Sequence, residues 1–102
     1  MKILILGAGR VGSSLASTLS RENYDVSVID NNKDKLLRLQ EDFDLATVIG
    51  HASHPHTLES AGADEETILL AVTNNDECNI ASCQIAKSKF KVKKTICRFS
   101  DT

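Results

Sequence analysis

The sequence predicts an α/β protein with a Rossmann-like, doubly wound parallel sheet, and three observations lead to that prediction. Apolar runs of strand length alternate with amphipathic segments of helix length, the pattern of a parallel sheet with right-handed crossovers and helices on both faces. A turn with the spacing G-x-G-x-x-G, at residues 7–12, follows the first apolar run. An acidic residue, Asp30, ends the second.

Length and composition agree with one globular domain. The chain has 102 residues, a formal charge of -2, 41% hydrophobic and 25% charged residues, which argues against disorder and against a general attraction to nucleic acid. We expect one domain over residues 1–102, short for a complete doubly wound domain. No apolar run approaches the ~20 residues of a membrane span, and no signal peptide is evident. A cytoplasmic location is therefore expected.

The first half of the chain predicts three strands and two helices. Residues 3–6 form an apolar run that ends at the glycine turn. Val11, Leu15 and Leu19 then recur every four residues, so a helix should run to about residues 21–23. The next expected elements are a strand, a helix and a strand, over residues 24–30, 33–41 and 45–49.

The second half predicts a short helix, a strand, a long helix and a last strand. Pro55 suits the first helical position and Gly62 the left-handed position after the end of a helix over residues 55–61. We expect the other three elements over residues 67–72, 74–89 and 95–99, with Ile80, Ala81, Ile85 and Ala86 packing from the long helix. A sheet of order 3-2-1-4-5 then places a ligand crevice at the strand carboxyl ends, where strands one and four diverge.

The glycine turn indicates a phosphate site. Gly7 suits the tight turn, Gly9 allows a pyrophosphate to approach the backbone, and Gly12 allows helix and strand to pack closely. The helix that follows directs unpaired N–H groups and the positive end of its dipole at the phosphates. Arg10 could neutralise phosphate charge, or could be an ordinary solvated arginine.

Asp30 makes this signal more specific. It stands at the end of the second strand, from which a carboxylate can accept hydrogen bonds from an adenosine ribose. Its charge would repel a 2'-phosphate, and Asn31 and Asn32 supply no compensating arginine, so NAD(H) or an adenine nucleotide is favoured over NADP. The alternative is an acidic loop residue or a cap of the next helix.

The histidines and cysteines give weaker signals. His51, His54 and His56 are close in sequence but span a strand end, a loop and a helix start, so solvated or nucleotide-adjacent imidazoles are favoured over a metal site. No metal is therefore expected. The three cysteines are odd in number and lack a C-x-x-C spacing, which indicates reduced, mostly buried thiols rather than disulfides.

Together these motifs resemble the N-terminal domain of Trk potassium-uptake proteins, the TrkA-N or RCK/KTN family of regulatory nucleotide-binding domains. The resemblance covers essentially the whole chain, and the segment Thr-Asn-Asn-Asp-Glu-Cys-Asn at residues 73–79 separates this family from ordinary dehydrogenases. The other matching segments are Gly-Ala-Gly-Arg-Val-Gly (7–12), Val-Ile-Asp (28–30), Leu-Glu-Ser-Ala-Gly (58–62), Ala-Lys (86–87) and Ile-Cys-Arg (96–98).

The resemblance implies a role for each candidate site residue. It implies that the glycine turn holds the phosphates, Asp30 a ribose, and Arg98 a phosphate or the far ribose, with Asn31 as a further residue in contact with the cofactor. One departure affects the base: the family usually has aspartate where this chain has His51, and an imidazole can donate or accept according to its tautomer. The remaining implied residues are Gly7, Ala8, Gly9, Arg10, Val11 and Gly12 at the turn, His51 and Ala52 at the adenine edge, and Thr73 and Asn74 at the distal half.

The resemblance also implies a non-enzymatic function. We expect a regulatory subunit that binds NAD(H), ATP or ADP and acts on a membrane-embedded potassium transporter, with no catalytic residues and no direct membrane insertion. The alternative is the cofactor-binding fragment of an NAD-dependent dehydrogenase, although no Tyr-x-x-x-Lys pair appears and the lone tyrosine, Tyr24, precedes the second strand. Nucleic-acid binding through the lysines of residues 87–94 is disfavoured by the negative net charge. An open edge at the fifth strand predicts a homo-oligomer, either a dimer or a larger ring.

Overall fold

A computed structural model describes residues 1–51 and 53–98. Its five strands form one parallel sheet of order β3-β2-β1-β4-β5, which confirms the predicted topology. The strands are β1 (Lys2–Leu6), β2 (Asp25–Asp30), β3 (Ala46–Ile49), β4 (Ile68–Ala71) and β5 (Lys94–Cys97). The helices are α1 (Arg10–Arg21), α2 (Lys33–Asp42), α3 (Pro55–Ser60) and α4 (Asp76–Lys89).

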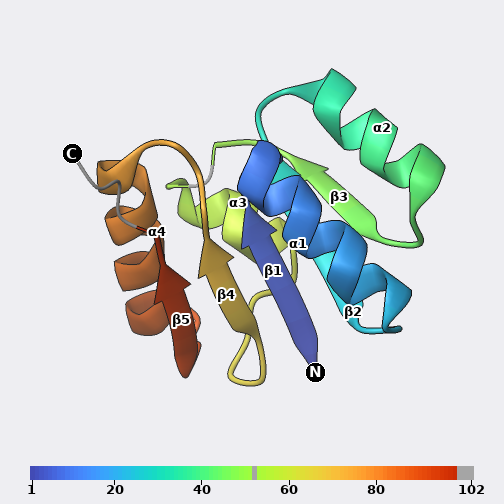
Figure 1. The fold of residues 1–102 in the computed structure, drawn as a ribbon. Coiled ribbons are helices and arrows are strands. Elements are labelled where there is room, and N and C mark those ends of the chain that lie inside the picture. Colours follow the sequence, from blue (N-terminus) through green and yellow to red (C-terminus); the bar gives the residue numbers. More distant parts are fainter. Residues whose placement is uncertain (52, 99–102) are drawn as a thin grey trace.

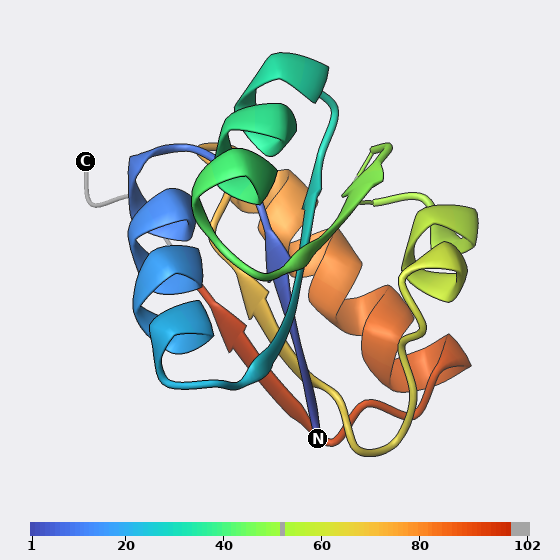
Figure 2. The same ribbon diagram turned by 90° about the vertical axis from the view of Figure 1, so that its right-hand side faces the viewer.

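The elements are stacked in three layers, with α1 and α2 on one face of the sheet and α3 and α4 on the other (Figures 1 and 2). Side chains of β1 alternate between two apolar cores: Ile3 and Ile5 pack towards α1 and α2, whereas Leu4 and Leu6 pack towards α3 and α4. This central strand is therefore buried on both faces, as its continuous apolar run predicts.

Local signals in the sequence account for most element ends. Asn32 caps α2 by accepting a hydrogen bond from the Lys35 backbone N–H at 3.2 Å, and Gly62 has the expected left-handed conformation, with φ of +80°. The expected packing of Ile80 is wrong, because its side chain is 38% exposed. Asn79 and Cys83 are instead among the α4 residues that are buried in the protein. Phe99, expected in the last strand, lies outside the described residues.

Candidate nucleotide-binding site

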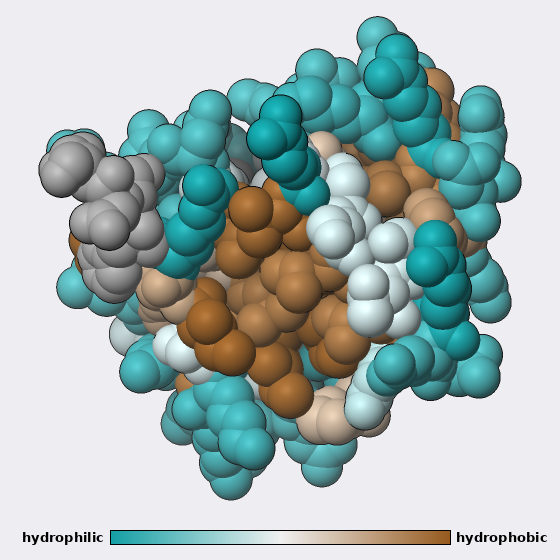
Figure 3. Space-filling model, viewed as in Figure 1, coloured by the Kyte–Doolittle hydropathy of each residue, from teal (hydrophilic) through white to brown (hydrophobic). Residues whose placement is uncertain are grey.

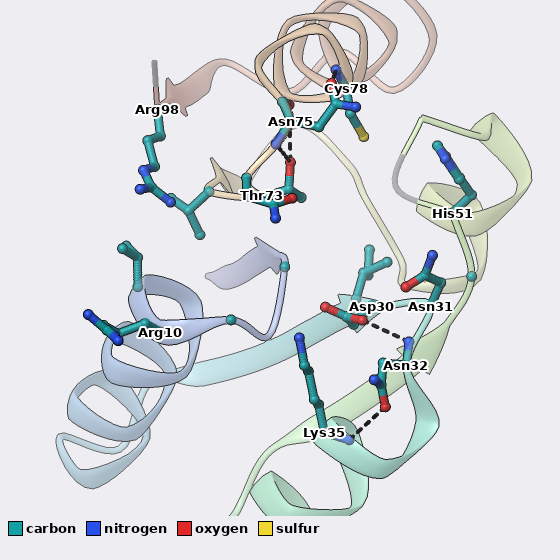
Figure 4. Close-up of a pocket in the computed structure, with 17 residues that line it drawn as sticks. Arg10, Asp30, Asn31, Asn32, Lys35, His51, Thr73, Asn75, Cys78 and Arg98 are labelled. Carbon is teal, nitrogen blue, oxygen red and sulfur yellow. Dashed lines mark hydrogen bonds between the residues drawn. The ribbon is translucent and has the colours of Figure 1, made fainter. Parts of the chain in front are cut away.

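A pocket of about 650 Å³ opens at the carboxyl ends of the strands, above the point where β1 and β4 lie side by side. Figure 4 shows Arg10 and Arg98 on one side of it and Asp30, Asn31 and His51 on the other. The pocket brings together most of the residues expected at the site: Gly7, Gly9, Arg10, Val11, Asp30, Asn31, His51, Thr73, Asn74 and Arg98.

The three glycines of the turn differ in what a side chain at each position would meet. Gly7 adopts φ of +108°, and a Cβ there would lie 3.0 Å from the Thr73 Cα atom. A Cβ on Gly12 would overlap the carbonyl group of Gly7, so α1 can approach the turn only because Gly12 has no side chain. A Cβ on Gly9 would meet nothing within 4 Å. Gly9 is therefore free of packing constraints and faces the open pocket.

Helix α1 begins at the pocket without a side-chain cap. Its N-cap residue is Gly9, no side chain in the described chain accepts from its first turn, and that turn has no acidic residue. In contrast, the side chains of Asn32 and Asn75 cap α2 and α4. The first N–H groups of α1 and its positive dipole end are therefore available to an anion in the pocket.

The Asp30 carboxylate is held in a defined orientation. Its Oδ2 atom accepts a hydrogen bond from the backbone N–H of Ala8 at 2.7 Å, and its Oδ1 atom accepts one from the N–H of Asn32 at 2.7 Å. Each carboxylate oxygen can accept a further hydrogen bond, so the group can still bind a diol. The bond to Ala8 also ties the end of β2 to the glycine turn.

Asn79 organises the opposite wall of the pocket, although it does not line it. This side chain is 0% exposed. Its Oδ1 atom accepts from the backbone N–H of Thr73 at 3.1 Å and from the Thr73 hydroxyl at 2.6 Å. Its Nδ2 group donates to the carbonyl oxygens of Thr73 and Arg98, each at 3.1 Å. Asn79 thus joins the ends of β4 and β5 to the first turns of α4.

His51 is exposed at the rim and is oriented by its own loop. Its Nδ1 atom accepts from the backbone N–H of Ser53 at 3.3 Å and lies 2.8 Å from the Ser53 hydroxyl. In the neutral ring this arrangement leaves the proton on Nε2. The ring stacks on that of His54, with centroids 5.0 Å apart.

Three expected residues do not line the pocket, and several unexpected ones do. The backbone of Ala8 donates to Asp30 and accepts from the Ser13 hydroxyl, Gly12 packs against the turn, and Ala52 lies outside the described residues. Lys35 is the most notable addition, because its side chain extends towards Asp30 and brings a cation to that end (Figure 4). Five other additions are adjacent in sequence to predicted residues: Ile29, Asn32, Gly50, Val72 and Asn75. The last is Cys78, in the first turn of α4.

The structure adds several findings on metals, membranes and charge. Within residues 1–51 and 53–98, no group of three or more His, Cys, Asp or Glu side chains could hold a metal ion. None of the helices in that part of the chain is long and apolar enough to cross a membrane. The lysines of the basic run are exposed: Lys87, Lys89, Lys91, Lys93 and Lys94.

The cysteines are free, and Cys83 is the buried one. Burial, and then the neighbouring Cys97 thiol, raise the pKa of Cys83 from 9.0 to about 11. Because the folded protein then keeps a proton that the unfolded chain releases, we expect the free energy of unfolding to fall as the pH rises from about 9 to about 11.

Urea unfolding of the wild-type protein and Cys83→Ala, at pH about 8.5 and about 10.5, measures this effect. The difference in stability between the two proteins should shrink at the higher pH, since the variant lacks the titrating thiol. An equal difference at both pH values would contradict the expectation.

These features define a class of protein: a Rossmann-like nucleotide-binding fold with a glycine-rich turn at the switch point of its sheet. The TrkA-N domain family model matches residues 3–102, and the chain belongs to that family, as the motifs predict. A protein of Vibrio alginolyticus named Trk system potassium uptake protein TrkA is 51% identical over 96% of this chain and 21% of its own length. The chain spans about a fifth of the length of this protein and of a TrkA protein from Halomonas elongata that is 44% identical to the chain.

Solved structures agree with the fold. The AMP-bound C-terminal domain of Kef from Shewanella denitrificans is similar with a TM-score of 0.82 and 22% identity, covering 99% of this chain and 60% of that one. The NAD(P)-binding domain of an exopolyphosphatase-related protein from Archaeoglobus fulgidus has a TM-score of 0.82 and 23% identity, covering 97% and 73%.

Proposed function

We propose that this chain is a nucleotide-sensing regulatory domain of a potassium-uptake system and is not an enzyme. The observation that carries the proposal is one pocket that combines an uncapped helix N-terminus with an oriented carboxylate, Asp30. The first suits phosphates and the second suits a ribose diol. NAD(H), ATP and ADP carry both groups, and the negative charge of Asp30 disfavours the 2'-phosphate of NADP.

In this proposal the two sides of the pocket divide the ligand between them. Asp30 and Asn31 bind the adenosine ribose, and the His51 Nε2–H donates to the edge of the adenine beside Ala52. Thr73, Asn74 and Arg98 face the distal half of the ligand. The phosphates lie over Gly7, Ala8, Gly9, Arg10 and Val11, and Gly12 allows the close approach of α1.

The names of the relatives support a potassium transporter as the partner of this domain. Because they are potassium-uptake proteins, we assign this domain to the cytoplasmic side of the inner membrane, bound to a membrane-embedded transporter subunit as part of a homo-oligomer. A nucleotide can control such an assembly only by binding its two arrangements with different affinities.

Calorimetric titration with NAD, NADH, ATP, ADP and NADP tests the proposal. We expect saturable binding of at least one of the first four and weaker binding of NADP. Gly9→Ala should weaken the affinity at least about tenfold, because the new Cβ takes space that the phosphates need. Its thermal unfolding should match wild type, since that Cβ meets no protein atom.

Two results would count against the proposal. Absence of saturable heat with every adenine nucleotide would remove the sensing function. If Gly9→Ala bound nucleotide with unchanged affinity, the proposed position of the phosphates beside Gly9 would be wrong, but the proposal of nucleotide binding would stand.

A further inference from the structure

A lysine of α2 faces the end of the pocket at which Asp30 lies. Lys35 is exposed in the first turn of α2, and its side chain extends from that helix towards the Asp30 carboxylate (Figure 4). Within residues 1–51 and 53–98, the Lys35 ammonium group has no hydrogen-bond or ion-pair partner. Its positive charge is therefore available to a ligand in the pocket.

The local sequence gives this lysine no stabilising role in α2. The first turn of a helix lies at the positive end of its dipole, where acidic side chains are favoured and cations are not. Asn32 is the N-cap of α2 and Lys35 is the third helical residue, the position at which a capping box has glutamate or glutamine. Lys33 has the same disadvantage, but of these two lysines it is Lys35 that lines the pocket. The place of Lys35 is therefore better explained by the pocket than by the helix.

The pocket continues past Lys35 into a second, basic groove. Lys35 and Arg10 line both the pocket and a groove of about 590 Å³ between α1 and α2. Arg38, one turn further along α2, lines the groove as well. Among the described residues around this groove, these three cations outnumber a single carboxylate, that of Asp42. A ligand group that projects towards α2 thus enters a region of net positive charge.

This positive charge changes what Asp30 alone would select. A carboxylate that binds the ribose diol repels a 2'-phosphate, and Rossmann proteins that accept NADP place a cation near that phosphate. Asn31 and Asn32, which follow Asp30 in sequence, supply none. Lys35 brings a cation to the same end of the pocket from the next helix. Asp30 and Lys35 together carry no net charge.

We propose that Lys35 faces the 2' position of the adenosine ribose and reduces the discrimination of the pocket against NADP. The inference rests on the proposed nucleotide binding and adds a specificity-determining residue to it. In NAD the ammonium group donates to the 2'-hydroxyl, and in NADP it pairs with the 2'-phosphate. Because hydrogen bonds to a charged acceptor are the stronger ones, Lys35 contributes more to the affinity for NADP than to that for NAD. NADP still binds more weakly than NAD, since its 2'-phosphate repels Asp30 and removes a hydroxyl from which Asp30 accepts.

The surroundings of Lys35 limit the size of the effect. Figure 3 shows mainly hydrophilic side chains over α2, in contrast to the apolar area at the centre of that view. An exposed ammonium group acts through water and is screened by salt. We therefore expect Lys35 to contribute about tenfold to the affinity for NADP and no more than about twofold to the affinity for NAD.

Calorimetric titration of the wild-type protein and Lys35→Met with NAD and NADP, at about 50 mM salt, tests the proposal. The ratio of the NADP to the NAD dissociation constant should rise at least about fivefold in Lys35→Met. Displacement of NAD gives the NADP constant if NADP binds too weakly for direct titration. The matched control is Lys33→Met, which removes the same charge from the same turn but not from the pocket, and it should change the ratio by less than about twofold. Lys35→Arg, which keeps the charge, should keep the ratio near that of wild type.

Two further ligands locate the phosphate on the ribose. Adenosine 2',5'-bisphosphate and adenosine 3',5'-bisphosphate carry the same charge at adjacent positions, and AMP is their common reference, so this comparison also serves a site that prefers ATP or ADP to NAD. Relative to AMP, Lys35→Met should weaken the 2',5'-bisphosphate at least about threefold more than the 3',5'-bisphosphate. Raising the salt from about 50 mM to about 500 mM should shrink the effect of Lys35→Met, because salt screens an exposed ion pair. Thermal unfolding establishes that both methionine variants are folded.

Four results would overturn the inference. These are equal changes of NAD and NADP affinity in Lys35→Met, an equal rise of the ratio in Lys33→Met, a larger loss for the 3',5'-bisphosphate, and a wild-type protein from which NADP does not displace NAD. Each of them leaves the sensing function standing, because each is measured on a protein that binds adenine nucleotides. Absence of nucleotide binding by the wild-type protein would instead refute the sensing function, and the role of Lys35 with it.

Discussion

Gly12→Ala is expected to destabilise the protein by more than about 3 kcal/mol, although alanine is the better helix former by about 1 kcal/mol. The new Cβ would overlap the carbonyl group of Gly7. The Gly7 carbonyl belongs to the backbone, and the position of a Cβ is fixed by its own backbone, so the clash cannot be relieved by a change of rotamer. Helix α1 would have to move away from the turn, which also lowers nucleotide affinity if the turn holds phosphates.

Thermal unfolding measures this effect, and about 3 kcal/mol corresponds to a fall in Tm of at least about 12 °C for a domain of this size. Gly9→Ala is the matched control: it changes the same motif by the same methyl group, where nothing lies within 4 Å. A Gly12→Ala protein as stable as Gly9→Ala would contradict the close approach of α1 to the turn.

Asn79→Leu is expected to cost about 3 to 5 kcal/mol while roughly conserving side-chain volume. It removes four hydrogen bonds, to the N–H, hydroxyl and carbonyl groups of Thr73 and to the carbonyl of Arg98. A buried polar group that loses its partner costs about 1 to 3 kcal/mol, and the half-exposed Thr73 can recover part of this from water.

Urea unfolding measures the loss, with Gln84→Leu as a control at an exposed position of the same helix. The control should lie within about 0.5 kcal/mol of wild type. An equal, small effect of both substitutions would show that Asn79 does not hold the pocket wall. Asn79→Asp should also be destabilised, because it keeps the acceptors but loses both donors and buries a charge.

The fold was predictable because its signals are local. The apolar runs, the turn at residues 7–12 and the cap at Asn32 each depend on a few consecutive residues. The end of α4 that faces the pocket was harder to predict. Ile80 is the more hydrophobic residue, yet Asn79 is buried, because its side chain joins Thr73, after β4, to the carbonyl group of Arg98, which lies 19 residues away in sequence after β5.

By itself, then, the sequence determined the order of the elements, the parallel sheet and the candidate residues at the strand ends. These follow from periodicity, backbone conformation and the rule that parallel strands end at one edge. Only the tertiary structure decided which groups meet across that edge: Asp30 with the N–H of Ala8, Asn79 with Thr73 and Arg98, and Lys35 beside Asp30. It also decided that Ile96 remains exposed, since burial depends on what packs over a residue and not on the residue itself.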